Sequence, residues 1–369
     1  MKKEGSVMKF YMPTVVYEEN EAVWNHRREL AALGTKALIM TGRSSAKANG
    51  SLDDVTKALD DQGIGYTIFS EVEENPSVET VERAAVQGRR DKADFVIGIG
   101  GGSPMDAAKA AAFLIKHKNK GAGDLYDASL DPAAVPVAEV PTTCGTGSEV
   151  TGVSVLTRNN GTKKGSIPHK IFADIALIDG KYIMNAPLSI IRNTAVDALG
   201  HLLESGLNSA RNEYSLMLVL EGLKYWKRIW QVVEGTKVLD QYAAEDLMHA
   251  SALAGMAIAQ TGTSVPHGLS YTLTCELGMP HGAAVGYYLG SYLKEAEKED
   301  DVLTREFLKC AGFTSAHDFE FFFEKVCETG EVPKETRQKA YDTLVSDEKR
   351  LATASYKIDT EMLKRIARI

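Results

Sequence analysis

The stretch ADFVIGIGGGSPMDAAKA, residues 93–110, runs from an apolar segment through three consecutive glycines into an alanine-rich segment. The apolar segment has the length of a buried strand, and the part from Pro104 onward has the composition of a helix. Glycines 100–102 let the backbone approach a ligand closely, Ser103 suits the N-cap of the helix, and Pro104 suits its first position. A strand, a glycine turn and a helix in this order are typical of α/β domains.

The same alternation of patterns extends through the first half of the chain. Strand-like runs at 10–17, 36–42, 66–72 and 93–102 alternate with helix-like runs at 51–63, 78–93 and 104–118. Because alternating strands and helices favour parallel pairing, we predict a parallel sheet. From Pro187 onward the pattern becomes almost entirely helical. The sequence therefore predicts an α/β domain over residues 1–186 and an all-helical domain over residues 187–369.

The composition excludes several classes of protein. The 369 residues are 44% hydrophobic and 25% charged, which is typical of a folded globular chain. The 42 basic and 50 acidic side chains give a net charge of -8, which argues against a nucleic-acid-binding protein. Four scattered cysteines indicate reduced thiols, and we see neither a signal peptide nor an apolar run long enough to span a membrane. We expect a cytoplasmic protein that binds neither nucleic acid nor membrane.

Two loops have the character of nucleotide-binding segments. The helix that follows the glycine turn would present free N–H groups and a positive dipole end, which bind phosphate well. The second loop, VPTTCGTGSEVT at 140–151, concentrates hydroxyls and glycines that can hold a pyrophosphate or a carboxamide. Either loop alone fits an ordinary turn equally well, and the glycines do not match the G-x-G-x-x-G spacing of dinucleotide folds. Both loops in one α/β domain favour nucleotide binding.

Four further residues have the chemistry of metal ligands. In VDALGHLLES, residues 196–205, Asp197 and His201 are four residues apart and share one helical face. His267 and His281 each stand between a proline and a glycine, which restrain the backbone around a ligand. One carboxylate and three imidazoles suit a divalent transition metal with a position left for substrate. The alternative is that the first two form a surface pair and that both Pro-His-Gly units simply begin helices.

Taken together, GGGSPMDAAKA, PTTCGTGSEVT, DALGHLLES and the pair VPHG and MPHG resemble the iron-containing (group III) alcohol dehydrogenase family. The resemblance extends from PTVVY near the N-terminus to about residue 290. It implies a dehydroquinate synthase-like fold, in which a nicotinamide-binding α/β domain packs on a helical metal domain with the active site in the cleft between them. It also implies Fe²⁺, or alternatively Zn²⁺, and a homodimer formed by pairing of the strand at 10–17.

The resemblance assigns roles to individual residues. The implied metal ligands are Asp197, His201, His267 and His281. The implied pyrophosphate contacts are Gly101, Gly102, Ser103 and Asp106. The implied neighbours of the nicotinamide half are Thr142, Thr143 and Thr146, with Lys164 near the ribose.

The sequence departs from the family pattern at two places. After the first strand, many relatives that use NAD have an aspartate that binds the ribose 2′-hydroxyl, whereas this chain has Gly42 followed by Arg43, Ser44 and Ser45. Loss of that carboxylate removes repulsion from a 2′-phosphate, so we predict NADP(H) in preference to NAD(H), with Gly42 and Ser44 in the cofactor site. Four residues beyond His267, where relatives often have a second histidine, this chain has Tyr271, which we predict to relay a proton.

The resemblance implies hydride transfer between NAD(P)(H) and a small primary alcohol or aldehyde, catalysed with a bound metal. Two alternatives within enzymes are a zinc-dependent glycerol-type dehydrogenase and a dehydroquinate-synthase-like lyase. A third alternative, from another class, is a catalytically silent protein that only binds nucleotide or metal.

Overall fold

The computed structural model describes residues 8–158 and 163–369. These residues form two compact units, each discontinuous in sequence. The sheet unit comprises Pro13–Ile191 and Val238–Ala252, and the helical unit comprises residues 8–12, Arg192–Lys237 and Leu253–Ile369.

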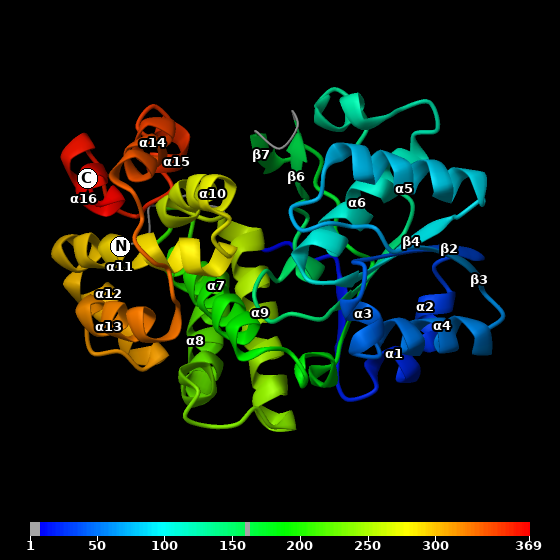
Figure 1. Cartoon of the computed structure of the whole chain (residues 1–369), viewed down its shortest axis with the longest axis horizontal. Helices are drawn as coiled ribbons and strands as arrows, with labels where there is room; N and C mark the ends of the chain where they lie inside the picture. The colour runs from blue at the N-terminus through cyan, green and yellow to red at the C-terminus, as the bar shows by residue number, and fades with distance from the viewer. Residues whose placement is uncertain (1–7, 159–162) are drawn as a thin grey trace. The chain divides into compact units, whose positions relative to one another are not determined.

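Six parallel strands form the sheet unit's central layer, in the order β1-β8-β5-β4-β2-β3. Figure 1 labels the neighbouring strands β4, β2 and β3 of this layer. The strands are β1 (Val15–Glu18), β2 (Lys36–Thr41), β3 (Gly65–Phe69), β4 (Phe95–Gly100), β5 (Val137–Pro141) and β8 (Ile175–Ile178). The predicted parallel sheet is confirmed. The strand expected at 10–17 is shorter, because pairing with β8 begins only at Val15, two residues after Pro13, which has no N–H to donate.

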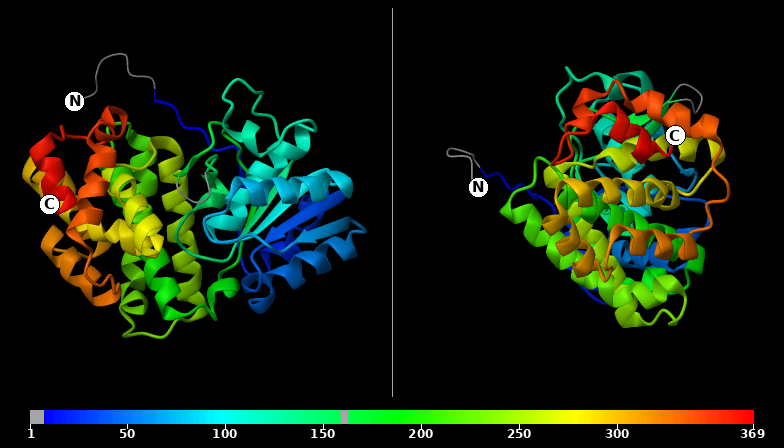
Figure 2. Two further views of the ribbon diagram at one scale, coloured as in Figure 1. Left: turned by 45° about the horizontal axis from the view of Figure 1, so that its top comes forward. Right: turned by 90° about the vertical axis from the view of Figure 1, so that its left-hand side faces the viewer.

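Helices cover both faces of this sheet (Figure 2). They are α1 (Ala22–Asn25), α2 (Arg27–Ala31), α3 (Ser45–Ala48) and α4 (Ser51–Asp61) on one face, and α5 (Val78–Arg90) and α6 (Gly102–Lys116) on the other. Successive strand residues point to opposite faces, so Leu38 packs in the core with α5 and α6 whereas Ile39 packs with α1–α4. Both faces are therefore buried, as expected for parallel strands rich in apolar residues.

Shorter elements complete the sheet unit. Three are short 3₁₀ helices, η1 (Ala122–Tyr126), η2 (Ser148–Val150) and η3 (Gly180–Ile183). The others are two antiparallel strands, β6 (Val155–Arg158) and β7 (Lys163–Ser166).

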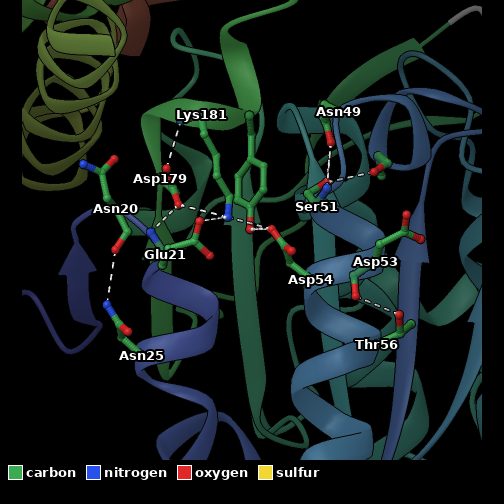
Figure 3. Close-up of polar contacts among 12 residues, drawn as sticks. Asn20, Glu21, Asn25, Asn49, Ser51, Asp53, Asp54, Thr56, Asp179 and Lys181 are labelled. Atoms are coloured by element: carbon green, nitrogen blue, oxygen red, sulfur yellow. Dashed lines mark hydrogen bonds and ion pairs between the residues drawn. The ribbon is translucent and has the colours of Figure 1, made fainter.

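Three carboxylates surround the Lys181 ammonium just beyond the end of β8 (Figure 3). Its Nζ lies 2.8 Å from Asp54 Oδ2, 2.9 Å from Glu21 Oε1 and 3.6 Å from Asp179 Oδ2. The Tyr182 hydroxyl also donates to Asp54, at 3.0 Å, and the Glu21 N–H donates to Asp179, at 2.7 Å. Glu21 precedes α1 and Asp54 lies in α4, so the network fastens both helices to the end of the sheet.

The second half of the chain is helical, as predicted. Its helices are α7 (Leu188–Gly206), α8 (Glu213–Glu234), α9 (Gln241–Thr261), α10 (Val265–Leu277), α11 (His281–Glu299), α12 (Asp301–Ala311), α13 (Ala316–Val326), α14 (Lys334–Leu344), α15 (Glu348–Leu351) and α16 (Thr360–Ala367). The buried Trp226 of α8 donates its indole N–H to the Ala195 carbonyl of α7, at 2.8 Å, which fixes α8 against α7. Over residues 8–158 and 163–369, no helix has the combined length and apolarity that crossing a membrane requires.

Candidate functional site

Helix α7 carries the first two predicted metal ligands in the helical unit's interior. Asp197 and His201 are only 3% and 5% exposed, so the alternative of a solvated surface pair is excluded. A buried carboxylate is costly unless charge or hydrogen bonds compensate it.

The other two predicted ligands lie in the first turns of α10 and α11. Both Pro-His-Gly units do begin helices, and this placement points the two imidazoles at Asp197. The Asp197 Oδ1 atom lies 3.4 Å from His267 Nε2 and 3.7 Å from His281 Nε2. The three residues can each offer one ligand atom, and these atoms all lie within 4.8 Å of one another. His267 and His281 therefore converge with a residue that precedes them by 70 or more positions, as a metal centre requires.

His201 lies beside this group of three. Its ring stacks on that of His267, with centroids 4.4 Å apart and planes 18° apart. Burial by itself would raise the pKa of Asp197, but the charges of His201 and His281 outweigh burial and hold that pKa well below its ordinary value. Asp197 is therefore an anion that His201 helps to stabilise.

Two buried atoms facing the centre of the group have unused bonding capacity. Among the described residues, Asp197 Oδ1 and His267 Nε2 have no hydrogen-bond partner. An ionised carboxylate and imidazole nitrogens directed at one point are the donor set that Fe²⁺ and Zn²⁺ accept. These residues therefore fit a divalent transition metal.

Glu204 belongs to this centre although the sequence did not reveal it. Its side chain is completely buried, and its Oε1 lies 2.5 Å from His267 Nδ1. Burial alone would lower the pKa of His267, but the Glu204 and Asp197 carboxylates raise it to about 9. One signal was available: Glu204 is seven residues after Asp197 and three after His201, which places all three on one face of α7.

Tyr271 lies one turn after His267 in α10. Its ring stacks against that of His281, with centroids 5.9 Å apart and planes 7° apart. The structure thus brings the predicted proton relay next to a predicted ligand.

In the sheet unit, the two predicted cofactor loops meet at the carboxyl ends of β4 and β5. A Cβ added to Gly101 would lie 3.0 Å from Thr143 Oγ1, and one added to Gly102 would lie 2.9 Å from Thr146 Cγ2. The Thr142 N–H donates to the Gly100 carbonyl, at 2.9 Å. Glycine at these two positions therefore lets the loops approach closely, because a side chain would crowd the facing threonine.

Helix α6 begins earlier than predicted. Its N-cap is Gly101 and not Ser103, so Pro104 occupies the third helical position instead of the first. The φ of +149° at Gly100 turns the chain early, and proline is tolerated in the first turn because those N–H groups have no intrahelical partner. Ser103 accepts a hydrogen bond through Oγ from the Asn75 N–H, at 3.1 Å.

Asn75 is a second residue that the sequence did not reveal. Besides its contact with Ser103, its Oδ1 accepts from Lys164 Nζ, at 2.6 Å, and its carbonyl accepts from the Thr157 hydroxyl, at 2.9 Å. Its φ of 55° lies in the left-handed region, which asparagine tolerates better than most residues. Asn75 therefore joins two predicted cofactor residues that are distant in sequence.

Asp106 is half-buried behind the loops. Its carboxylate accepts hydrogen bonds from the Ser148 hydroxyl, at 2.6 Å, and from the Val155 N–H, at 2.8 Å. The ammonium of Lys109 also donates to the Ser148 carbonyl, at 2.6 Å. These contacts hold the end of the 140–151 loop against α6.

Gly42 and Ser44 follow the carboxyl end of β2, which pairs with β4. Arg43, Ser44 and Ser45 are exposed, and Ser44 is the N-cap of α3. The three polar side chains are therefore accessible to a ligand at that strand end.

Glu139 of β5 is a completely buried acid beside Lys109 of α6. Among the residues that the structure describes, neither of its oxygens has a hydrogen-bond partner, and Lys109 Nζ lies 3.9 Å from Oε1. Burial raises the pKa of Glu139 well above its ordinary value of 4.5, and the attraction of Lys109 only partly opposes this. The folded protein thus holds a proton on Glu139 that the unfolded chain releases above about pH 4.5.

The free energy of unfolding should consequently fall as the pH rises from about 4.5 toward the raised pKa of Glu139. The variant Glu139→Gln cannot ionise, so we expect its free energy of unfolding, relative to the parent's, to rise steadily as the pH is raised from 5 to 9. Urea denaturation across this pH range measures both. The exposed Glu74→Gln is the control, and parallel pH profiles for parent and Glu139→Gln would contradict the expectation.

A parallel-sheet unit with a glycine turn at a helix N-terminus, together with a helical unit that contains a buried carboxylate–imidazole group, is typical of metal-binding oxidoreductases. Family comparison gives the particular assignment. Residues 13–180 match the model of iron-containing alcohol dehydrogenases, and residues 191–363 match the C-terminal model of the same family. The chain belongs to the iron-containing alcohol dehydrogenase family.

Individual relatives agree with this assignment. The chain is 34% identical over 258 residues to a sulfoacetaldehyde reductase of Bilophila wadsworthia, a match that covers 69% of this chain but only 65% of that protein. It is 30% identical over 298 residues to an NADPH-dependent butanol dehydrogenase of Clostridium saccharobutylicum, covering 78% and 74%. An iron-containing alcohol dehydrogenase of Thermotoga maritima has a similar crystal structure, with a TM-score of 0.90, 38% identity, and coverage of 98% of this chain and 99% of that one.

Proposed function

We propose that the protein is a metal-dependent alcohol dehydrogenase, or aldehyde reductase, that transfers a hydride between NAD(P)(H) and a small primary alcohol or aldehyde. The observation that carries the proposal is the convergence of Asp197, His267 and His281 within 4.8 Å in a chain of this family. The three relatives described above are named as dehydrogenases or a reductase. They favour neither a lyase nor a catalytically silent protein.

Asp197, His201, His267 and His281 would hold the metal, with Fe²⁺ favoured and Zn²⁺ as the alternative. A divalent cation bound there would supply Lewis acidity toward the substrate oxygen. Asp197 would contribute the single negative charge among these four side chains, and the buried imidazoles of His201 and His267 would exclude water from their side of the centre. Tyr271, stacked on His281, would hold or donate a proton at its phenol oxygen.

The start of α6 and the 140–151 loop would bind the dinucleotide. We propose that the N–H groups of Gly101, Gly102 and Ser103 bind the pyrophosphate, supported by the positive end of the helix dipole. Hydroxyls of the loop would lie beside the nicotinamide half; they belong to Thr142, Thr143 and Thr146. Lys164, which donates to Asn75, would lie near the ribose. Asp106 would contribute by holding the loop in place through Ser148.

We propose NADP(H) as the preferred cofactor, with Gly42 and Ser44 in its site. The exposed Arg43 and Ser44 at the end of β2 can contact a 2′-phosphate, and no carboxylate occupies residues 42–45 to repel it. The butanol dehydrogenase relative is also named as NADPH-dependent.

A crossed kinetic assay tests the activity and the cofactor together. Protein reconstituted with Fe²⁺ or Zn²⁺ is assayed at 340 nm with short aldehydes and either NADPH or NADH. We expect aldehyde-dependent oxidation with a kcat/KM at least about tenfold higher for NADPH, and Arg43→Ala should reduce that preference to about two- to threefold, since one exposed phosphate contact is worth about 1 kcal/mol. No turnover with any aldehyde would refute the activity, and a preference for NADH would refute the cofactor assignment alone.

We further propose a homodimer and a cytoplasmic location. Strand β1 is at one edge of the six-stranded sheet and Val15 on it is 49% exposed, so a second copy of the chain can pair there. All four cysteines lie in the described part of the chain, and none is in a disulfide. Reduced thiols are typical of cytoplasmic proteins.

A further inference from the structure

The completely buried carboxylate of Glu204 connects two helices of the candidate metal centre. Its Oε1 lies 2.5 Å from His267 Nδ1, and its Oε2 accepts from the Ser264 N–H, also at 2.5 Å. Glu204 is in α7, whereas Ser264 and His267 are at the start of α10. Both oxygens are thus used at the point where the two helices meet.

The contact with Nδ1 determines which ring nitrogen faces the centre. Because a carboxylate only accepts hydrogen bonds, His267 must carry its proton on Nδ1. Its Nε2 is then directed to Asp197 Oδ1, 3.4 Å away, where a metal would need an unprotonated nitrogen.

The contact with Ser264 holds the backbone of the same turn. Ser264 is the N-cap of α10, and its own side chain makes no capping hydrogen bond. The guanidinium of Arg350 donates to the Thr263 carbonyl, at 3.1 Å, and the Ser264 hydroxyl bonds Thr353 Oγ1, at 2.9 Å. Glu204 is therefore the member of this network that reaches both the backbone at the helix start and the imidazole ring.

We propose that Glu204 is a positioning residue for the metal centre, which orients His267 and strengthens it as a ligand; this inference rests on the proposed function. A carboxylate hydrogen-bonded to the remote nitrogen of an imidazole makes the other nitrogen a better donor, and loss of such a contact typically weakens metal binding by about 10–100-fold.

Metal affinity tests the proposal without reference to turnover. Metal-free parent and variants are titrated with Co²⁺ against a chromophoric chelator, and the visible spectrum of bound Co²⁺ reports ligand geometry. In Glu204→Gln, the amide keeps the size of the side chain but presents an NH₂ group to one of the two donors. We expect about 10–100-fold weaker Co²⁺ binding and an altered Co²⁺ spectrum.

Glu295→Gln is the matched control. Glu295 is also a buried acid of the helical unit, 3% exposed, but it bonds Arg365 and Lys298 instead of a histidine. Its variant should bind Co²⁺ as the parent does, with an unchanged spectrum.

A third variant separates this inference from the proposed function. Asp197→Asn should lose Co²⁺ binding altogether. If Asp197→Asn loses the metal while Glu204→Gln keeps the parent's affinity and spectrum, the role of Glu204 is overturned and the metal centre stands. If Asp197→Asn retains the parent's affinity, the metal centre itself is overturned.

If Glu204→Gln does not fold, a measurement on the parent protein still tests the proposal. In Zn²⁺-loaded protein with ¹⁵N-labelled histidine, long-range ¹H–¹⁵N spectra should show His267 protonated at Nδ1, with its Nε2 carrying no proton. Protonation at Nε2 would overturn the proposal.

Discussion

Replacing Asp197 by asparagine or His267 by alanine should remove the bound metal and reduce turnover by at least about a thousandfold, while dinucleotide binding stays within about twofold of the parent. Asp197 Oδ1 and His267 Nε2 are 3.4 Å apart and face one point, so the first change removes the negative charge from the donor set and the second removes a nitrogen donor. Loss of Lewis-acid stabilisation costs several kcal/mol of transition-state binding, and each 1.36 kcal/mol is tenfold in rate.

Three measurements check this expectation: metal content by elemental analysis, kcat with a saturating aldehyde, and the dissociation constant for NADPH by fluorescence. Dinucleotide binding is expected to persist because its proposed residues all belong to the sheet unit. The matched control is His317→Ala, which removes an exposed histidine of α13 in the helical unit. Stoichiometric metal and full activity in either site variant would contradict the proposed ligand set.

The variant Gly282→Ala should destabilise the protein by at least about 2 kcal/mol and weaken metal binding. An added Cβ would lie only 1.7 Å from the Asn193 carbonyl oxygen and 3.2 Å from Asp197 Cβ. The first contact is with backbone of α7, which cannot rotate away, so α7 and α11 would have to separate. Separation would move His281, which precedes Gly282, away from Asp197.

Whether the free energy of unfolding falls or rises in Gly282→Ala distinguishes the steric clash from the effect of helix propensity. Alanine is a better helix former than glycine by about 1 kcal/mol, so without the clash the substitution would stabilise α11. Urea denaturation and Co²⁺ titration measure the two expected losses. Gly268→Ala is the control, because the nearest atoms to its Cβ would be side-chain atoms, namely the terminal methyl of Leu344, at 2.9 Å, and methylenes of Arg350. A Gly282→Ala protein at least as stable as the parent would show that the helices can adjust.

Local patterns predicted most of the fold. Alternation of apolar strands with helix-like runs identified the parallel sheet, and the long helical periodicity after Pro187 identified the second half. Errors occurred at element boundaries: β1 is shorter than the apolar run, and α6 begins at Gly102 instead of Pro104. At both boundaries a backbone property decided, namely the missing N–H of Pro13 and the positive φ of Gly100.

Some residues of the candidate site could likewise be predicted from the sequence, and others could not. The four-residue spacing of Asp197 and His201 and the two Pro-His-Gly units are visible in the sequence, and the family resemblance links them. Glu204 and Asn75 remained hidden. An acidic residue late in a helix usually faces solvent, and an asparagine before a proline usually marks a turn, so neither pattern signals a residue that makes several hydrogen bonds to distant segments.

The sequence by itself determined which segments become strands and helices, where the glycines permit close approach, and which side chains have ligand chemistry, because these depend on neighbours only a few residues away. Only the tertiary structure decided that Asp197, His267 and His281 face one point and that Glu204 holds His267 in place. The reason is that these contacts join α7 to residues more than sixty positions later, whose proximity depends on the packing of α7, α10 and α11 and on the missing side chain at Gly282.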